Sequence, residues 1–198
     1  MTIKDIIAEA LASGQSKDFT NWLRFCLQWE CAYEEDGVTI RCENVPGDSG
    51  GLTFAGVDQA SHPCFPYDNP HAFDVVCAYL QDGWKPMHAS EIGFPAGAVA
   101  ANFAINMGVG AAVQLLQEAL DAQTQVRIDG RIGPATLGAA KRVNLNRLAH
   151  DIDAAADARY RRIACTHTVE RKFLAGWLAR DAALERWWER IESSETVC

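Results

Sequence analysis

Apolar residues recur along most of the chain at the three- to four-residue spacing of α-helices. Capping residues, prolines and glycines divide this pattern into separate segments. The pattern predicts helices over 3–12, 18–30, 70–82, 95–105, 111–120, 134–141 and 144–160, and another that begins at Thr168. The chain is therefore expected to be mainly helical.

One stretch departs from this pattern. Asp36-Gly37 is a two-residue turn signal, and the β-branched run Val38-Thr39-Ile40 follows it. These residues predict a β-hairpin over about 32–43. With neither an internal repeat nor an evident linker, the expected fold is mainly α, an α+β arrangement in which a helical domain carries a small β-hairpin lobe.

Glu30 ends the second predicted helix in an unusual position. On a helical wheel at about 100° per residue it falls inside an apolar arc and not on the polar side with Arg24. The seven members of the arc are Phe19, Trp22, Leu23, Phe25, Cys26, Leu27 and Trp29. Carboxylates are seldom buried without a partner or a purpose. Desolvation and the negative end of the helix dipole both disfavour the charged form there, which suits a general acid. An ion pair in the core, or an arc that opens to solvent at this point, remains an alternative.

A polar loop follows the hairpin. Asp48, Gly50, Gly51 and Thr53 form the pattern Asp-x-Gly-Gly-x-Thr, which presents a carboxylate and a hydroxyl beside backbone that a ligand can approach closely. An Asx-type turn closed by Asp48 is the structural alternative. A helix-terminal glutamate, a hairpin and a loop Asp/Thr pair together are typical of a glycosidase, with an acid on one side of the bond and a second polar group on the other.

Net charge and composition limit the kinds of molecule that the protein is expected to bind. The chain of 198 residues has a formal net charge of −8, so it lacks the basic surface that nucleic acid or an anionic membrane would require. It contains no apolar run of the roughly 20 residues that a membrane span needs. The first helix carries charges within its apolar pattern, so we expect an amphipathic helix and not a signal peptide.

The seven cysteines have irregular spacing and do not predict a disulfide framework. Cys31 and Cys42 bracket the predicted hairpin and would be able to pair in an oxidising compartment. A zinc site formed by His62, Cys64, His71 and Cys77 is disfavoured because the paired ligand spacings of such sites are missing. We therefore expect neither a metal nor another cofactor.

Two motifs near Glu30 resemble the glycoside hydrolase family 108 lysozymes, which are N-acetylmuramidases. Glu-Cys-Ala-Tyr at 30–33 matches the family's Glu-Gly-Gly-Tyr, with Cys31-Ala32 in place of two glycines. The segment 48–57 matches the family's Asp-Pro-Gly-Gly-x-Thr-x-x-Gly-Ile. The resemblance implies that Glu30 is the catalytic acid and that Asp48 and Thr53 are its catalytic partners. Gly50 and Gly51 are implied to lie along the substrate.

Further matches follow in the family's order along the chain. Gly-Trp at 83–84 and Phe-Pro at 94–95 resemble its Tyr-Trp and Leu-Pro, and 102–108 resembles its Asp-Phe-x-Val-Asn-x-Gly, with Asn102 in place of aspartate. The segments 116–120 and 129–136 resemble the family's peptidoglycan-binding-like region, and 173–180 its Phe-x-x-Gly-Trp-x-x-Arg. The substrate-binding residues then also include Tyr33, Trp84, Asn102 and Asn106. For the two aromatic residues, packing is as good an explanation as stacking on sugar.

The resemblance implies a lysozyme-like catalytic region over 1–110 and a helical peptidoglycan-binding-like region over 111–198, packed into one compact unit. The expected function is hydrolysis of the β-1,4 bond between N-acetylmuramic acid and N-acetylglucosamine in peptidoglycan glycan strands. The alternatives are a non-catalytic peptidoglycan-binding module and a chitinase-like hydrolase. Without a signal peptide, the protein would reach the periplasm or cell wall as a phage endolysin released through a holin, or as an injected antibacterial effector with a cognate immunity protein.

Overall fold

The computed structural model describes residues 1–44 and 50–195, and the chain divides into two compact units, 1–81 and 82–198. The predicted boundary after residue 110 falls inside the second unit, in the first turn of α6 (Val109–Thr124), which follows α5 (Ala96–Met107). That boundary separates two predicted functional regions, and the fold alone does not test it.

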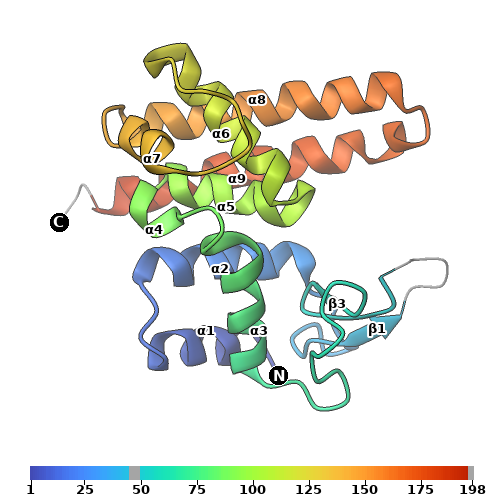
Figure 1. Cartoon of the computed structure of the whole chain (residues 1–198). Coiled ribbons are helices and arrows are strands. Elements are labelled where there is room, and N and C mark those ends of the chain that lie inside the picture. Colours follow the sequence, from blue (N-terminus) through green and yellow to red (C-terminus); the bar gives the residue numbers. More distant parts are fainter. Residues whose placement is uncertain (45–49, 196–198) are drawn as a thin grey trace. The chain divides into compact units, whose positions relative to one another are not determined.

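The first unit contains three helices and a small sheet (Figure 1). The helices are α1 (Ile3–Ala12), α2 (Lys17–Glu30) and α3 (Ala72–Tyr79), and α1 packs against both of the others. Ser16 caps α2, because its side chain accepts a hydrogen bond from the Phe19 backbone N–H at 3.2 Å. The helix predicted over 18–30 therefore begins one residue earlier, and Asp18 lies in its first turn.

The three strands of the sheet are antiparallel and lie in chain order: β1 (Cys42–Asn44), β2 (Leu52–Phe54) and β3 (Val57–Asp58). The hairpin predicted over about 32–43 is present as a single β-bridge between Tyr33 and Ile40. The Asp36 side chain closes the loop between these two residues. Its Oδ1 accepts hydrogen bonds from the backbone N–H groups of Val38 and Thr39, both at 2.8 Å.

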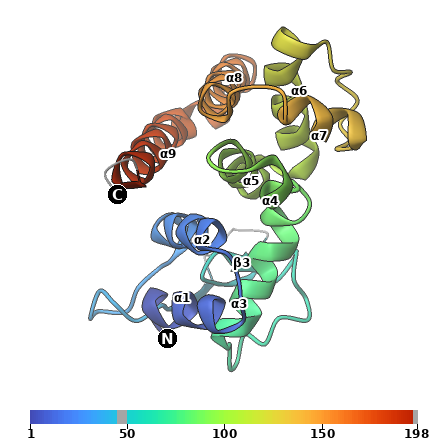
Figure 2. The ribbon, with the colours of Figure 1, turned by 90° about the vertical axis from the view of Figure 1, so that its left-hand side faces the viewer.

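The second unit surrounds α5, whose residues from Ala96 to Ala104 are all buried. A helix that is apolar on every side is buried on every side, and α5 packs against α4 (Ala89–Ile92), α6 and α8 (Leu145–Thr166). Helix α7 (Pro134–Ala140) packs on α6. Figures 1 and 2 show α8 side by side with the last helix, α9 (Leu174–Glu195). Two other helical segments belong to the chain: η1, a π-helix (Leu80–Trp84), and η2, a 3-10 helix (Glu170–Phe173).

The fold is thus mainly α with a small antiparallel sheet, as the sequence predicted. The described helices include none that is long and apolar enough to cross a membrane.

Carboxylates are buried where α8 faces α9. Asp181 is only 2% exposed, and its neighbours include the carboxylates of Asp153 and Asp157 and the guanidinium of Arg180. Burial, reinforced by the two aspartates, raises the pKa of Asp181 to about 8, and a proton shared with Asp157 adds to this effect. Burial and the carboxylates of Asp157 and Glu185 raise the pKa of Asp153 to about 7.

The stability of this unit should therefore depend on pH. The pKa of Asp181 rises from 3.8 to about 8 on folding, so the folded protein holds a proton that the unfolded chain releases. The stabilising effect of that proton is complete below about pH 4 and is lost as the pH rises through about 8. Asp181→Asn should flatten this dependence and raise the free energy of unfolding at pH 8 by about 1–3 kcal/mol, since no carboxylate charge is then buried. Denaturant unfolding followed by circular dichroism between pH 4 and pH 9 measures both effects.

Asp121→Asn, at an exposed position of α6, is the matched control and should leave the pH dependence of the wild type unchanged. An equally steep pH dependence in the Asp181→Asn protein would contradict this account.

Candidate active site

Glu30 is the last residue of α2, and the apolar arc of that helix positions it. Six of the seven predicted members of the arc are buried: Phe19, Trp22, Leu23, Phe25, Cys26 and Leu27. Trp29, the seventh, is 42% exposed, which differs from the prediction. Glu30 itself is half-buried, so the arc opens to solvent in the last turn and the carboxylate lies at the edge of the core.

The turn between β2 and β3 has an unusual backbone. Ala55 and Gly56 are its two central residues, and both have positive φ angles, 53° and 79°. Two consecutive left-handed residues match the right-handed twist of the flanking strands, as in a type I′ hairpin turn. The Tyr79 hydroxyl on α3 donates a hydrogen bond to the Ala55 carbonyl at 2.9 Å, which ties this turn to the helical part of the unit.

Gly56 packs directly against Glu30. A Cβ atom added at Gly56 would lie 2.6 Å from Cβ and 3.1 Å from Cγ of Glu30, and 2.7 Å from the Tyr79 hydroxyl oxygen. No real Cβ tolerates such distances, so the approach of the turn to the end of α2 requires glycine at this position. The contact brings together three elements: the end of α2, the β2–β3 turn and α3.

The residues that follow Glu30 lie in a partly desolvated region. Burial, with a smaller effect from the negative charge of Glu30, raises the pKa of the Cys31 thiol to about 12. The thiol is therefore protonated at neutral pH and is not a nucleophile. Burial also raises the pKa of Tyr33, which is half-buried. Tyr33 remains a candidate for contact with a sugar ring close to Glu30.

Gly50, Gly51 and Thr53 lie at and before β2. Gly51 has a φ angle of 74°, and the Gly50 carbonyl accepts a hydrogen bond from the Ala60 N–H at 3.0 Å. Thr53 is half-buried in the central strand, in register with Glu43 of β1 and Asp58 of β3. Asp48, the predicted partner of Glu30, lies outside the described residues.

Glu43 and Asp58 are candidate site residues that the sequence did not suggest. Residues directly opposite one another in an antiparallel sheet project to the same face, so both carboxylates share a face with the Thr53 hydroxyl. Glu43 also forms an ion pair with Arg41 at 3.0 Å. Strands of two or three residues carry too little alternation to reveal such a register.

The other predicted substrate contacts belong to the second unit. Trp84 is 6% exposed and donates a hydrogen bond from Nε1 to Ser90 Oγ at 2.9 Å. Asn102 is fully buried, and its Oδ1 accepts a hydrogen bond from Arg180 Nη2 at 3.3 Å. The burial of both side chains favours a packing role. Asn106 is half-buried near the end of α5 and hydrogen-bonds the Tyr160 hydroxyl.

The Asp-Gly-x-x-Gly-Pro-x-Thr motif at 129–136 closes a loop around Gln117, which is 1% exposed. Gln117 Nε2 donates to Asp129 Oδ1 at 2.9 Å and lies 3.3 Å from Thr136 Oγ1, while its Oε1 accepts from the Gly130 N–H at 2.8 Å. The motif therefore supplies internal hydrogen bonds, which agrees with the structural explanation of its turn.

No zinc group forms from the histidines and cysteines of the first unit. His62, Cys64 and Cys77 line one cavity of about 330 Å³. Within the described part of the chain, however, the only ligand atoms close enough together to hold a metal belong to His150, Glu185 and Glu189 at the surface of α8 and α9, all within 4.8 Å of one another. Cys31 and Cys42, which bracket the predicted hairpin, are free thiols.

Comparison with known proteins gives two results. Residues 111–182 match a family described as "Predicted Peptidoglycan domain". This match supports an association of the chain with peptidoglycan. A solved structure, "Structure of Brucella abortus SagA", aligns with a TM-score of 0.57 and 18% sequence identity, over 92% of this chain and 97% of that chain, and shows a shared fold. No curated protein matches.

The contact between Gly56 and Glu30 predicts the effect of one substitution. Gly56→Ala places a methyl group within 2.6 Å of Glu30 Cβ, at a φ angle of 79°. We expect the free energy of unfolding to fall by about 2–5 kcal/mol, because left-handed strain and overpacking add together. Denaturant unfolding of the two purified proteins measures the difference.

Gly37→Ala is the matched control, because Gly37 also has a positive φ of 66° but nothing lies within 4 Å of the added Cβ. This substitution adds only the left-handed strain, so it should lower the free energy of unfolding by about 1–2 kcal/mol. Equal losses in the two variants would show that the turn does not pack on Glu30 as described.

Proposed function

We propose that the protein is a peptidoglycan hydrolase that cleaves the β-1,4 bond between N-acetylmuramic acid and N-acetylglucosamine. The observation that carries the proposal is the position of Glu30, held half-buried at the end of α2 by the β2–β3 turn. A carboxyl group on a rigid helix end, beside a small sheet rich in polar groups, is suited to donate a proton to a leaving oxygen. The peptidoglycan domain match over 111–182 supports the identity of the polymer.

In this mechanism Glu30 protonates the glycosidic oxygen. A second polar group stabilises the oxocarbenium-like transition state or orients the attacking water. Asp48 and Thr53 are the proposed partners, with Gly50 and Gly51 leaving the backbone accessible to the sugar. Glu43 and Asp58 share the Thr53 face of the sheet and are further carboxylates for this role. The separation of the two carboxyl groups decides between retention, at about 5–5.5 Å, and inversion, at about 6.5–9.5 Å.

A non-catalytic peptidoglycan-binding module is the second candidate. One observation favours it: the matched segment 111–182 lies entirely within the second unit, whereas Glu30 belongs to the first unit. Binding to insoluble sacculi without release of reducing ends would support this alternative. Release of reducing ends from chitin oligomers in preference to sacculi would instead indicate a chitinase-like hydrolase.

Its place of action would be the periplasm or cell wall. A phage endolysin and an injected antibacterial effector both meet that requirement. If the protein is an effector, the producing cell needs an immunity protein. The chain's net charge of −8 gives no attraction to the acidic wall and is more usual for an injected toxin than for an endolysin.

Glu30→Gln tests the catalytic assignment. The amide keeps the shape of the side chain but cannot donate the proton, so reducing-end release from purified sacculi should fall by about 10²- to 10⁴-fold. Glu34→Gln, at an exposed position four residues away, should retain the wild-type rate. A Glu30→Gln protein that releases reducing ends as fast as the wild type would remove Glu30 from the mechanism.

A further inference from the structure

A cavity of about 490 Å³ lies between α6 and α8 in the second unit. Its volume is in the range of small-ligand sites. Every lining residue falls within 111–182, the segment that matches the peptidoglycan domain. None of the substrate-binding residues predicted from the sequence lines it.

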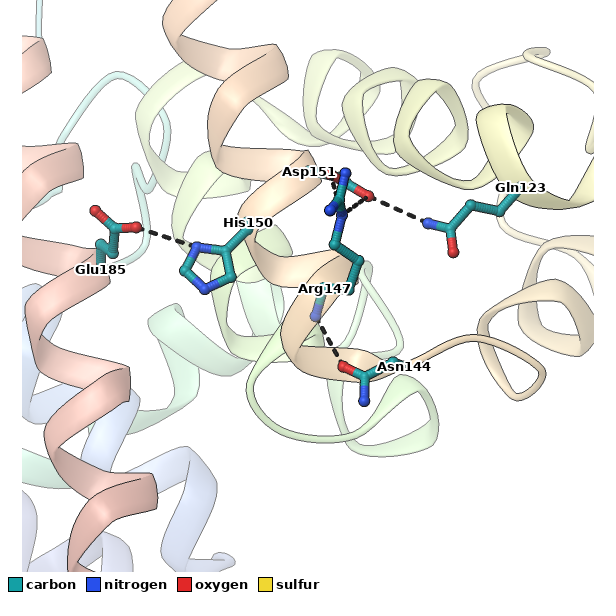
Figure 3. A network of polar contacts seen from close by, with 6 residues as sticks. All are labelled: Gln123, Asn144, Arg147, His150, Asp151 and Glu185. Atoms are coloured by element: carbon teal, nitrogen blue, oxygen red, sulfur yellow. Dashed lines mark hydrogen bonds and ion pairs between the residues drawn. The ribbon is translucent and has the colours of Figure 1, made fainter.

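One side of the cavity presents a cation held in a fixed position. Arg147 Nε donates to both carboxylate oxygens of Asp151, at 2.9 and 3.1 Å, and Gln123 Nε2 donates to Asp151 Oδ2 at 3.2 Å (Figure 3). The Arg147 backbone N–H in turn donates to Asn144 Oδ1 at 2.9 Å, at the start of α8. Asp151 thus orients the guanidinium through its Nε.

The two Nη groups of Arg147 hydrogen-bond none of the residues that the structure describes, and the side chain is 72% exposed. The planar guanidinium is the side chain best suited to bind a carboxylate through two parallel hydrogen bonds. The geometry therefore leaves the outer edge of Arg147 available for a carboxylate ligand.

The remaining lining has the opposite charge and small side chains. Glu118 on α6 is an exposed carboxylate that makes neither an ion pair nor a hydrogen bond with a described residue. Ala119, Ala122 and Ala155 supply the apolar part of the wall. Their methyl groups leave space for the small side chains of a ligand, while Glu118 suits an ammonium group.

We propose that this cavity binds the short peptide stem of peptidoglycan, with a stem carboxylate on Arg147 and an amino group on Glu118. The inference rests on the proposed peptidoglycan substrate and adds a peptide subsite to it. The stem is short, carries both charges and contains alanines, so it matches the charges and the alanine wall of the cavity. A bare chain of N-acetylglucosamine offers neither a carboxylate nor an ammonium group.

The test is calorimetric titration of the full chain with the tetrapeptide L-Ala-γ-D-Glu-meso-diaminopimelate-D-Ala. The wild type should bind it, and Arg147→Ala should weaken binding at least tenfold. Arg147→Lys, which keeps the charge but loses the planar fork, should give an intermediate affinity. Arg162→Ala, an exposed arginine four turns further along α8, is the matched control and should stay within about twofold of the wild type.

The same peptide with amidated carboxylates tests the contact in the unchanged protein. Amidation should weaken binding to the wild type about as much as Arg147→Ala does, and the two changes together should cost no more than either alone. Absence of tetrapeptide binding to the wild type at millimolar concentration, or equal affinities in Arg147→Ala and Arg162→Ala, would overturn the inference.

Reducing-end release from sacculi by the wild type separates this inference from the proposed function. Hydrolysis without peptide binding leaves the proposed function standing and removes the peptide subsite. Peptide binding through Arg147 without hydrolysis leaves the subsite standing and removes the hydrolase.

Discussion

The approach of the β2–β3 turn to the end of α2 is the constraint on which the candidate active site depends. Gly56 lacks a side chain and therefore lets the turn lie against Cβ and Cγ of Glu30, and the hydrogen bond from Tyr79 to the Ala55 carbonyl holds the turn in that place. The same contact connects the β2–β3 hairpin, which carries Thr53 on its first strand, to the helix that carries the proposed acid.

The second unit is arranged around a buried helix. Helix α5 is buried on all sides, and the helices around it place their polar groups in separate locations. Gln117 forms hydrogen bonds with the loop 129–136, whereas Asp181 is buried and Asp153 half-buried, and both hold protons at neutral pH more readily than ordinary aspartates. Arg147 and Asp151 remain at the surface beside a cavity. The last of these arrangements lines a cavity of about 490 Å³.

Much of the helical framework is predictable from the sequence because caps and apolar spacing act locally. Helix α1 ends where it was predicted to end. The helix predicted to begin at Asn144 begins at Leu145, and Asn144 is its cap, whose side chain accepts a hydrogen bond from the Arg147 N–H. The strands were less predictable. Asp36-Gly37 is the stronger turn signal in the sequence, and the Asp36 side chain closes that loop by accepting two backbone hydrogen bonds. The regular hairpin nevertheless forms at Ala55-Gly56. A turn with alanine in a left-handed conformation is stabilised by its tertiary contacts, which a sequence pattern does not contain. The register that brings Glu43 and Asp58 beside Thr53 was hidden because strands of two or three residues carry too little alternation to reveal it.

The central claim concerns the bond that is cut. Mass spectrometry of borohydride-reduced fragments, released from purified sacculi by the wild-type protein, measures it directly. The account predicts disaccharide-peptide fragments whose reduced end is N-acetylmuramic acid and which do not form with the Glu30→Gln protein. Fragments reduced at N-acetylglucosamine, fragments cut only within the peptide, or intact sacculi after prolonged incubation would contradict it.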